Sequence, residues 1–125
     1  MVSNHVVLLI EDEEMVIDVA SMMLIRLGCE VEVSKTGSEA IAAMQANSNK
    51  FDFMIVDFNL PDMTAIECLT EIRKISKTPA ILSSGYGNNL SEEECDALIV
   101  KAILSKPFSL SQLEAVLESV SNPQA

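Results

Sequence analysis

Basic residues are scarce in this chain. Its 125 residues include 8 lysines and arginines against 19 aspartates and glutamates, which gives a formal net charge of −11. Because binding to a phosphate backbone needs a basic surface, we expect no direct contact with nucleic acid. The same charge disfavours anionic membrane surfaces. The composition therefore excludes two common classes of partner.

Long apolar runs are absent as well. No run approaches the length of roughly 20 residues that a membrane-spanning helix needs. The first five residues lack the basic segment and longer apolar segment that are typical of a signal peptide. Cysteine is limited to Cys29, Cys68 and Cys95, which are far apart and form no C-x-x-C pair. This spacing argues against structural zinc and against a disulfide scaffold, and it favours a reducing cytoplasm.

What is present indicates a folded domain. Apolar residues make up 49% of the chain and charged residues 22%, which is a globular composition. A chain of this length can bury one real core. We find no internal repeat, linker or second domain, and we expect a single domain over residues 1–125 with a core from about 5 to 120.

Strand-like apolar runs alternate five times with helical patterns. We expect strands near residues 5–10, 29–33, 51–56, 80–83 and 102–105. A helical pattern covers 15–27, and the later helices follow the capping signals that start at Thr36, Thr64, Ser91 and Ser109. This alternation predicts an α/β fold of (βα)5 type, a doubly wound parallel sheet with helices on both faces.

Hydrophobic patterns also assign faces. Runs 5–10 and 51–56 are almost continuously apolar, as in central strands, whereas 29–33 alternates with glutamates, as at a sheet edge. We expect the seven methionines to fall mostly in the core. Two inward-facing helical stripes are predicted, one with Val16, Ala20, Met23 and Leu27, the other with Ala65, Leu69, Ile72 and Ile75.

The chemistry lies where apolar runs end. Glu11 and Asp12 follow the first run, Asp57 follows the third, and Lys106 follows the fifth. In a parallel sheet these ends meet at one edge, where ligands bind. Closely packed carboxylates repel and raise one another's pKa unless a cation joins them. The pattern predicts a site for a hard divalent metal beside a carboxylate nucleophile. Taken singly, the acidic run at 11–14 also suits a helix start, and Asp57 also suits a turn.

Four segments together carry a family resemblance. They are Ile10-Glu11-Asp12-Glu13, the stretch from Val56 to Met63, Leu82-Ser83-Ser84-Gly85, and Ser105-Lys106-Pro107-Phe108. In order and spacing the chain resembles a response-regulator receiver domain over roughly residues 5–120. The resemblance implies a flavodoxin-like three-layer sandwich with strand order 2-1-3-4-5, and a place in two-component signalling or a phosphorelay.

The resemblance also implies roles for individual residues. Asp57 would take a phosphoryl group from a histidine kinase or a His phosphotransfer protein. Glu11, Asp12, Asp57 and the backbone carbonyl of Asn59 would hold Mg²⁺, with Mn²⁺ as the alternative ion. Lys106 and the hydroxyl of Ser84 would contact phosphoryl oxygens. The switched chain would then act on a downstream protein target, as a monomer or weak dimer.

Three further positions would modulate this chemistry. The family implies that Asn59 and Tyr86 tune dephosphorylation, with the ring of Tyr86 shielding the acyl phosphate from water. Ile103 stands where the family usually has an aromatic ring that couples the site to output. We therefore expect output through a different surface, or a role as an intermediate phosphoryl carrier. Ala65 replaces a usual glycine, so we expect Thr64 to cap the third helix.

Three rival functions fit less well. A flavodoxin-like electron carrier needs a loop rich in Ser, Thr and Gly after the first strand, where this chain is acidic. An aspartate-dependent phosphohydrolase usually has a second aspartate where Asn59 stands, and an amide cannot transfer protons. A receiver used only as an unphosphorylated interaction module would not need the complete set of site residues. We expect a receiver that catalyses its own phosphorylation and dephosphorylation rather than an enzyme with a separate substrate.

Overall fold

The computed structural model describes residues 5–85 and 90–121. Strands and helices alternate along the whole of this length, as the sequence predicts. They are β1 (Val6–Ile10), α1 (Glu14–Arg26), β2 (Glu30–Ser34), α2 (Gly37–Ala46), β3 (Phe53–Asp57), α3 (Ala65–Ile72), β4 (Ala80–Ser84), α4 (Glu92–Leu98), β5 (Val100–Ser105) and α5 (Leu110–Ser121). No helix in these ranges is both long enough and apolar enough to cross a lipid bilayer.

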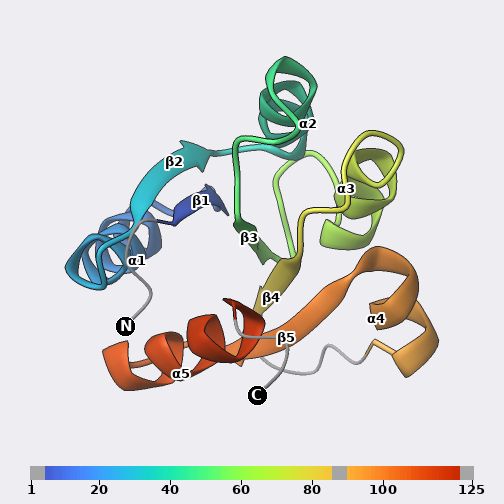
Figure 1. Ribbon diagram of the computed structural model, residues 1–125. Coiled ribbons are helices and arrows are strands. Elements are labelled where there is room, and N and C mark those ends of the chain that lie inside the picture. The colour runs from blue at the N-terminus through green and yellow to red at the C-terminus, as the bar shows by residue number, and fades with distance from the viewer. Residues whose placement is uncertain (1–4, 86–89, 122–125) are drawn as a thin grey trace.

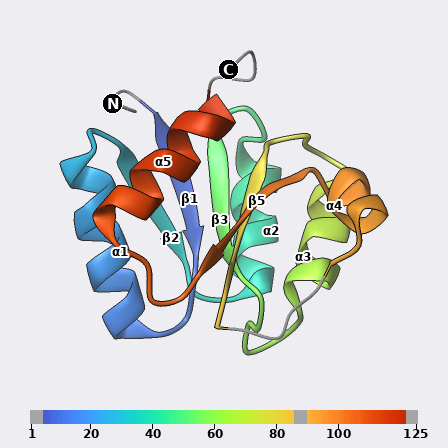
Figure 2. The same ribbon diagram turned by 90° about the horizontal axis from the view of Figure 1, so that it is seen from below.

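The five strands form one parallel sheet in the order β2-β1-β3-β4-β5, which confirms the expected order. Helices α1 and α5 cover one face, and α2, α3 and α4 cover the other (Figures 1 and 2). Side chains at alternating strand positions point to opposite faces of the sheet and pack into two separate hydrophobic cores, one on each face. The result is the predicted three-layer sandwich, with β1 and β3 in its interior and the half-exposed β2 at one edge.

Several strand bounds differ from those expected. β3 runs from Phe53 to Asp57 rather than over 51–56, and β5 begins at Val100 rather than near 102. Val100 joins the sheet because it pairs with Ala80 and is buried. β4 extends to Ser84. Asp57 and Ser84 are therefore the last residues of neighbouring strands, which fixes their position at the carboxyl edge.

Some of the predicted inward-facing residues are not in the core. α1 buries Ile17, Ala20 and Leu24, whereas the expected Val16 and Met23 are only half-buried. α3 ends at Ile72, so Ile75 leaves the helical stripe and is 40% exposed. Met44 and Met54 are buried as expected, but Met15 and Met22 on α1 are exposed.

Side-chain caps fix where four helices begin. Thr64 with Glu67, and Ser91 with Glu94, form reciprocal capping boxes before α3 and α4. Ser109 and Gln112 exchange the same pair of bonds before α5. Before α2, the Thr36 side chain accepts from the backbone N–H of Glu39. The Glu39 carboxylate accepts from the backbone N–H of Lys35 rather than from that of Thr36. Ala65 is thus accommodated as the fully buried first residue of a helix capped by Thr64, as expected.

Candidate functional site

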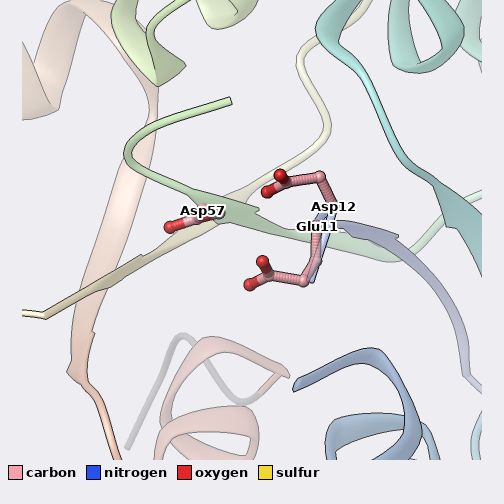
Figure 3. A group of neighbouring side chains, drawn as sticks. All are labelled: Glu11, Asp12 and Asp57. Atoms are coloured by element: carbon pink, nitrogen blue, oxygen red, sulfur yellow. The ribbon is translucent and has the colours of Figure 1, made fainter. Parts of the chain in front are cut away.

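Charged side chains from distant parts of the chain meet at the carboxyl edge of the sheet. Glu11 and Asp12 directly follow β1, and Asp57 ends β3, its neighbour in the sheet. Figure 3 shows these three side chains together where the two strands end. One oxygen from each carboxylate lies within 4.8 Å of the other two. The predicted convergence of acidic strand ends is therefore present.

Glu11 is the buried member of this group, at 2% exposure. Its backbone N–H donates to the carbonyl of Ser34 over 3.0 Å. Its carboxylate accepts from the N–H of Glu13 at 3.2 Å and from Nζ of Lys106 at 2.9 Å. Burial raises the pKa of Glu11 above its ordinary value, and the bonds from Lys106 and Glu13 offset this only in part. A cation close to the buried carboxylate of Glu11 would therefore stabilise its ionised form.

Lys106 supplies one such cation. Its Nζ lies 2.9 Å from Oε1 of Glu11 and 3.1 Å from Oδ1 of Asp57. Burial lowers the pKa of Lys106, but the hydrogen bonds to these two carboxylates outweigh it, and the pKa is raised overall. Its backbone N–H donates to the carbonyl of Ser84 at 2.8 Å, and the bond to Pro107 is cis. The segment after β5 therefore holds a charged ammonium group against the carboxylate of Asp57.

The cluster has a net negative charge that a divalent cation can neutralise. Three carboxylates and one ammonium sum to a formal charge of −2 at this edge. Carboxylate oxygens are the ligands that Mg²⁺ prefers, at distances of about 2.1 Å, so two oxygens on one ion are at most about 4.2 Å apart. In this cluster one oxygen from each carboxylate lies within 4.8 Å of the other two, so small side-chain movements bring them to that separation. The residues present thus fit a magnesium-sized ion in charge and donor type.

Of the other predicted site residues, Ser84 and Asn59 lie on or close to the strand ends that carry this cluster. Ser84 is buried at the end of β4, which lies between β3 and β5. Asn59 is exposed in the segment between β3 and α3, where it forms an antiparallel bridge with Thr64. Ile103 does not join the cluster, because its side chain is 45% exposed on β5, opposite Leu82. Tyr86 lies outside the described residues.

Asp62 has contacts that its sequence position does not suggest. It follows Pro61 in the segment between β3 and α3. Its carboxylate accepts from the backbone N–H of Gly37 at 2.8 Å and of Ser38 at 3.0 Å, and from the Ser38 hydroxyl at 2.8 Å. Asp62 and Gly37 are 25 positions apart in the chain, and no spacing signal links them. The fold brings them together, because α2 and α3 pack side by side on the same face of the sheet.

An apolar groove opens beside the charged cluster. It has a volume of about 410 Å³ and lies between α1 and the segment that joins β5 to α5. Its lining includes Met15, Val16, Val19, Lys106, Pro107 and Phe108. The apolar surface continues along α1 from Met15 and Val19 in the groove to Met22 and Ile25. These four side chains are exposed by 78%, 50%, 70% and 62%. Exposed apolar residues that recur on one helix mark a surface suited to contact with another protein.

Known proteins resemble this chain in sequence and in fold. The chemotaxis protein CheY4 from Vibrio cholerae is 29% identical, with a TM-score of 0.82 over 93% of this chain and 98% of that one. The receiver domain of a sensor histidine kinase from Pseudomonas aeruginosa, solved with magnesium in its active-site cleft, is 24% identical, with a TM-score of 0.80 over 95% and 99% of the two chains.

A curated relative is the aerobic respiration control sensor protein ArcB of Escherichia coli, 30% identical over 115 residues, which are 90% of this chain and 14% of that protein. This chain spans 20%, 52% and 46% of the length of three further curated relatives. The family model of the response regulator receiver domain matches residues 7–118. With the fold and the acidic strand ends in place, these matches show that the chain belongs to the response regulator receiver domain family.

Proposed function

We propose that this chain accepts a phosphoryl group on Asp57 from a phosphohistidine. An oxygen of the Asp57 carboxylate attacks phosphorus, the P–N bond breaks, and a P–O bond forms. The departing imidazole keeps the electron pair of the P–N bond and takes up a proton. The observation that carries the proposal is the contact of Asp57 with the ammonium of Lys106, together with its position within 4.8 Å of the carboxylate oxygens of Glu11 and Asp12.

The acidic residues would hold Mg²⁺, or Mn²⁺ in its place. Glu11, Asp12, Asp57 and the backbone carbonyl of Asn59 would be its protein ligands. When bound, the ion neutralises negative charge on the acceptor and on the phosphoryl group. Since Asp12 is exposed and Glu11 is buried, the cluster opens to solvent on one side, where a donor can approach.

Lys106 and Ser84 would bind oxygens of the phosphoryl group once it is on Asp57. The ammonium of Lys106 binds Asp57 before transfer and can reach a phosphoryl oxygen carried by the same carboxylate afterwards. The hydroxyl of Ser84, on the neighbouring strand, would donate to another phosphoryl oxygen. Little covalent chemistry remains for the protein, because phosphoryl transfer depends mainly on positioning and on charge neutralisation. The chain would catalyse its own modification in this way, and also its reversal, with Asn59 and Tyr86 setting the rate.

The phosphoryl donor would be a protein domain that carries a phosphohistidine, in a histidine kinase or a His phosphotransfer protein. Two features support a protein donor. The apolar groove and the exposed stripe of α1 are continuous with the acceptor site, since Lys106 contributes to both. ArcB, one of the relatives, is named as a sensor protein. A helical domain with an apolar face would fit this surface.

Phosphorylation would then change which protein the chain binds. Ile103 on β5 is exposed and has no aromatic ring, which supports output through a surface other than an aromatic switch at this position. We infer a cytoplasmic location, because the three cysteines are widely spaced in the sequence and form no C-x-x-C pair, a pattern typical of a reducing compartment.

Incubation with a small acyl-phosphate donor and Mg²⁺ tests the acceptor role. Intact mass should show one phosphoryl adduct on the wild-type chain, none on Asp57→Asn, and loss of adduct formation when the metal is chelated. Asp52→Asn is the matched control, because Asp52 lies at the opposite end of β3 and binds the N–H of Val6. An adduct that forms at full yield on Asp57→Asn would refute the site.

A further inference from the structure

Asp62 links two segments that are distant in sequence. Gly37 and Ser38 are the first two residues of α2, and their N–H groups have no acceptor within the helix. The Asp62 carboxylate accepts from both, and from the Ser38 hydroxyl, at 2.8 to 3.0 Å. The Ser38 hydroxyl and these N–H groups lower the pKa of Asp62 below its ordinary value. The carboxylate therefore stays charged at the positive end of the α2 dipole.

The segment that carries Asp62 is itself closely folded. Between β3 and α3, Leu60 donates to the carbonyl of Met63 at 3.2 Å, and Ala65 donates to that of Phe58 at 2.9 Å. Asn59 and Thr64 pair across the loop. Because these hydrogen bonds connect the residues of the loop, contacts that fix Asp62 also restrict the position of Asn59. Residues 58–64 are therefore joined to one another by backbone contacts.

Packing reinforces the same junction. A Cβ built on Gly37 would lie 2.5 Å from Cγ and from Sδ of Met63. Any larger residue at this position would require the Met63 side chain to move away from the start of α2. The loop is thus held against α2 by hydrogen bonds from Asp62 and by direct contact with Met63.

The start of α2 also connects to the opposite side of the acidic cluster. Ser34, at the end of β2, accepts the backbone N–H of Glu11 at 3.0 Å. Lys35 pairs with Glu14 at the first turn of α1. Residues 34–38 therefore contact the Glu11 side of the site through Ser34, and the Asn59 side through Asp62.

From this arrangement we infer that Asp62 is a positioning residue for the metal site. It fixes the loop of residues 58–64, and with it the Asn59 carbonyl, at a set distance from Glu11 and Asp12. The inference rests on the proposed function, which makes that carbonyl a metal ligand. Asp62 touches neither the ion nor the phosphoryl group, and it acts through the loop alone. Substitutions of residues that orient metal ligands typically reduce metal affinity by about 10-fold or more.

Magnesium affinity of the full chain tests this role. The dissociation constant is measured from amide chemical shifts during a Mg²⁺ titration of the wild type, Asp62→Ala and Asp62→Glu. Asp52→Ala is the control, because it removes a carboxylate that caps the N–H of Val6 at 2.7 Å at the other end of the sheet. We expect the dissociation constant to rise about 10-fold in Asp62→Ala and to stay at the wild-type value in Asp52→Ala.

Asp62→Glu separates position from charge. It keeps the negative charge, but its longer side chain cannot make the same bonds to Gly37 and Ser38. We expect it to bind Mg²⁺ as weakly as Asp62→Ala, with faster amide exchange at Leu60 in both variants. Wild-type affinity in Asp62→Ala or in Asp62→Glu would overturn the inference and leave the proposed function standing. A wild-type chain that binds no Mg²⁺ and takes up no phosphoryl group would overturn both.

Discussion

The ammonium group of Lys106 lies 3.1 Å from Oδ1 of Asp57, although the two residues are 49 positions apart in the chain. The parallel sheet brings them together, because β5 and β3 both end at the carboxyl edge, on either side of β4. The same ammonium binds Glu11, so one positive charge contacts both the proposed phosphoryl acceptor and a proposed metal ligand. Removing it should affect metal binding and phosphoryl transfer in opposite directions.

Lys106→Met should bind Mg²⁺ more tightly and accept phosphoryl groups more slowly. The first effect follows because the variant raises the negative charge at the cluster from −2 to −3. The second follows because a positioned charge that stabilises a transition state contributes about 100-fold or more to a rate. Metal titration and the time course of adduct formation measure the two. Lys101→Met, at an exposed position on the same strand, is the control. Unchanged transfer in Lys106→Met would contradict the role of this lysine.

Glu11→Gln should abolish the response of thermal stability to Mg²⁺. The folded-state pKa of Glu11 lies above its ordinary value of 4.5. The folded state therefore binds this proton more tightly than the unfolded state, and the ionised group costs stability above that raised pKa. Without metal, Glu11→Gln should be at least as stable as the wild type at pH 7, and the difference should narrow as the pH falls toward 4.5. Unfolding temperatures with and without Mg²⁺ across this range measure both effects. Equal Mg²⁺ stabilisation of the variant would count against Glu11 as a ligand.

Gly37→Ala should destabilise the fold at the junction of α2 with the β3–α3 loop. The added methyl group would lie 2.5 Å from the Met63 side chain, so that side chain must shift. Overpacking of this kind costs about 1–3 kcal/mol. Denaturant unfolding measures it, and the double variant with Met63→Ala should be less destabilised than the sum of the two single variants, since the shorter side chain relieves the clash. If the destabilisation of the double variant equals the sum of the two single variants, a clash with Met63 does not explain the effect of Gly37→Ala.

Met22→Glu should separate the two kinds of phosphoryl donor. Met22 is 70% exposed on α1 and is not a member of the charged cluster. A charge at this point should slow transfer from a phosphohistidine-bearing domain about 10-fold or more, because it places an unpaired charge in an apolar contact. Phosphorylation by a small acyl phosphate should keep its wild-type rate. Ile75→Glu, at another exposed apolar residue that follows α3, is the matched control. Equal slowing with both donors would contradict a docking role for α1.

The sequence predicts the fold and the acidic cluster because both depend on local signals. Five apolar runs with capping residues between them specify the order of strands and helices. Each of Glu11, Asp57 and Lys106 directly follows such a run, so a parallel sheet suffices to bring them together.

Contacts between segments that no local rule connects could not be predicted. The three hydrogen bonds of Asp62 depend on how the β3–α3 loop lies against α2. The exposure of Met15 and Met22 depends on which side of a largely apolar helix faces the sheet, and α1 has apolar residues on both sides. Ile75 fits a helical stripe by its spacing but lies beyond the end of α3 at Ile72. In each case tertiary packing decided between positions that the sequence pattern leaves equivalent.

Reduction of the phosphorylated chain with borohydride tests the central claim most directly. An acyl phosphate is reduced to an alcohol, which converts the modified aspartate to homoserine. Trypsin cleaves after Lys50 and Arg73, so one peptide carries Asp52, Asp57 and Asp62 together. Fragmentation of this peptide should place homoserine at position 57 alone, and only in samples treated with both the donor and Mg²⁺. Homoserine at position 52 or 62, or an adduct that yields none at position 57, would contradict the assignment of Asp57 as the phosphoryl acceptor.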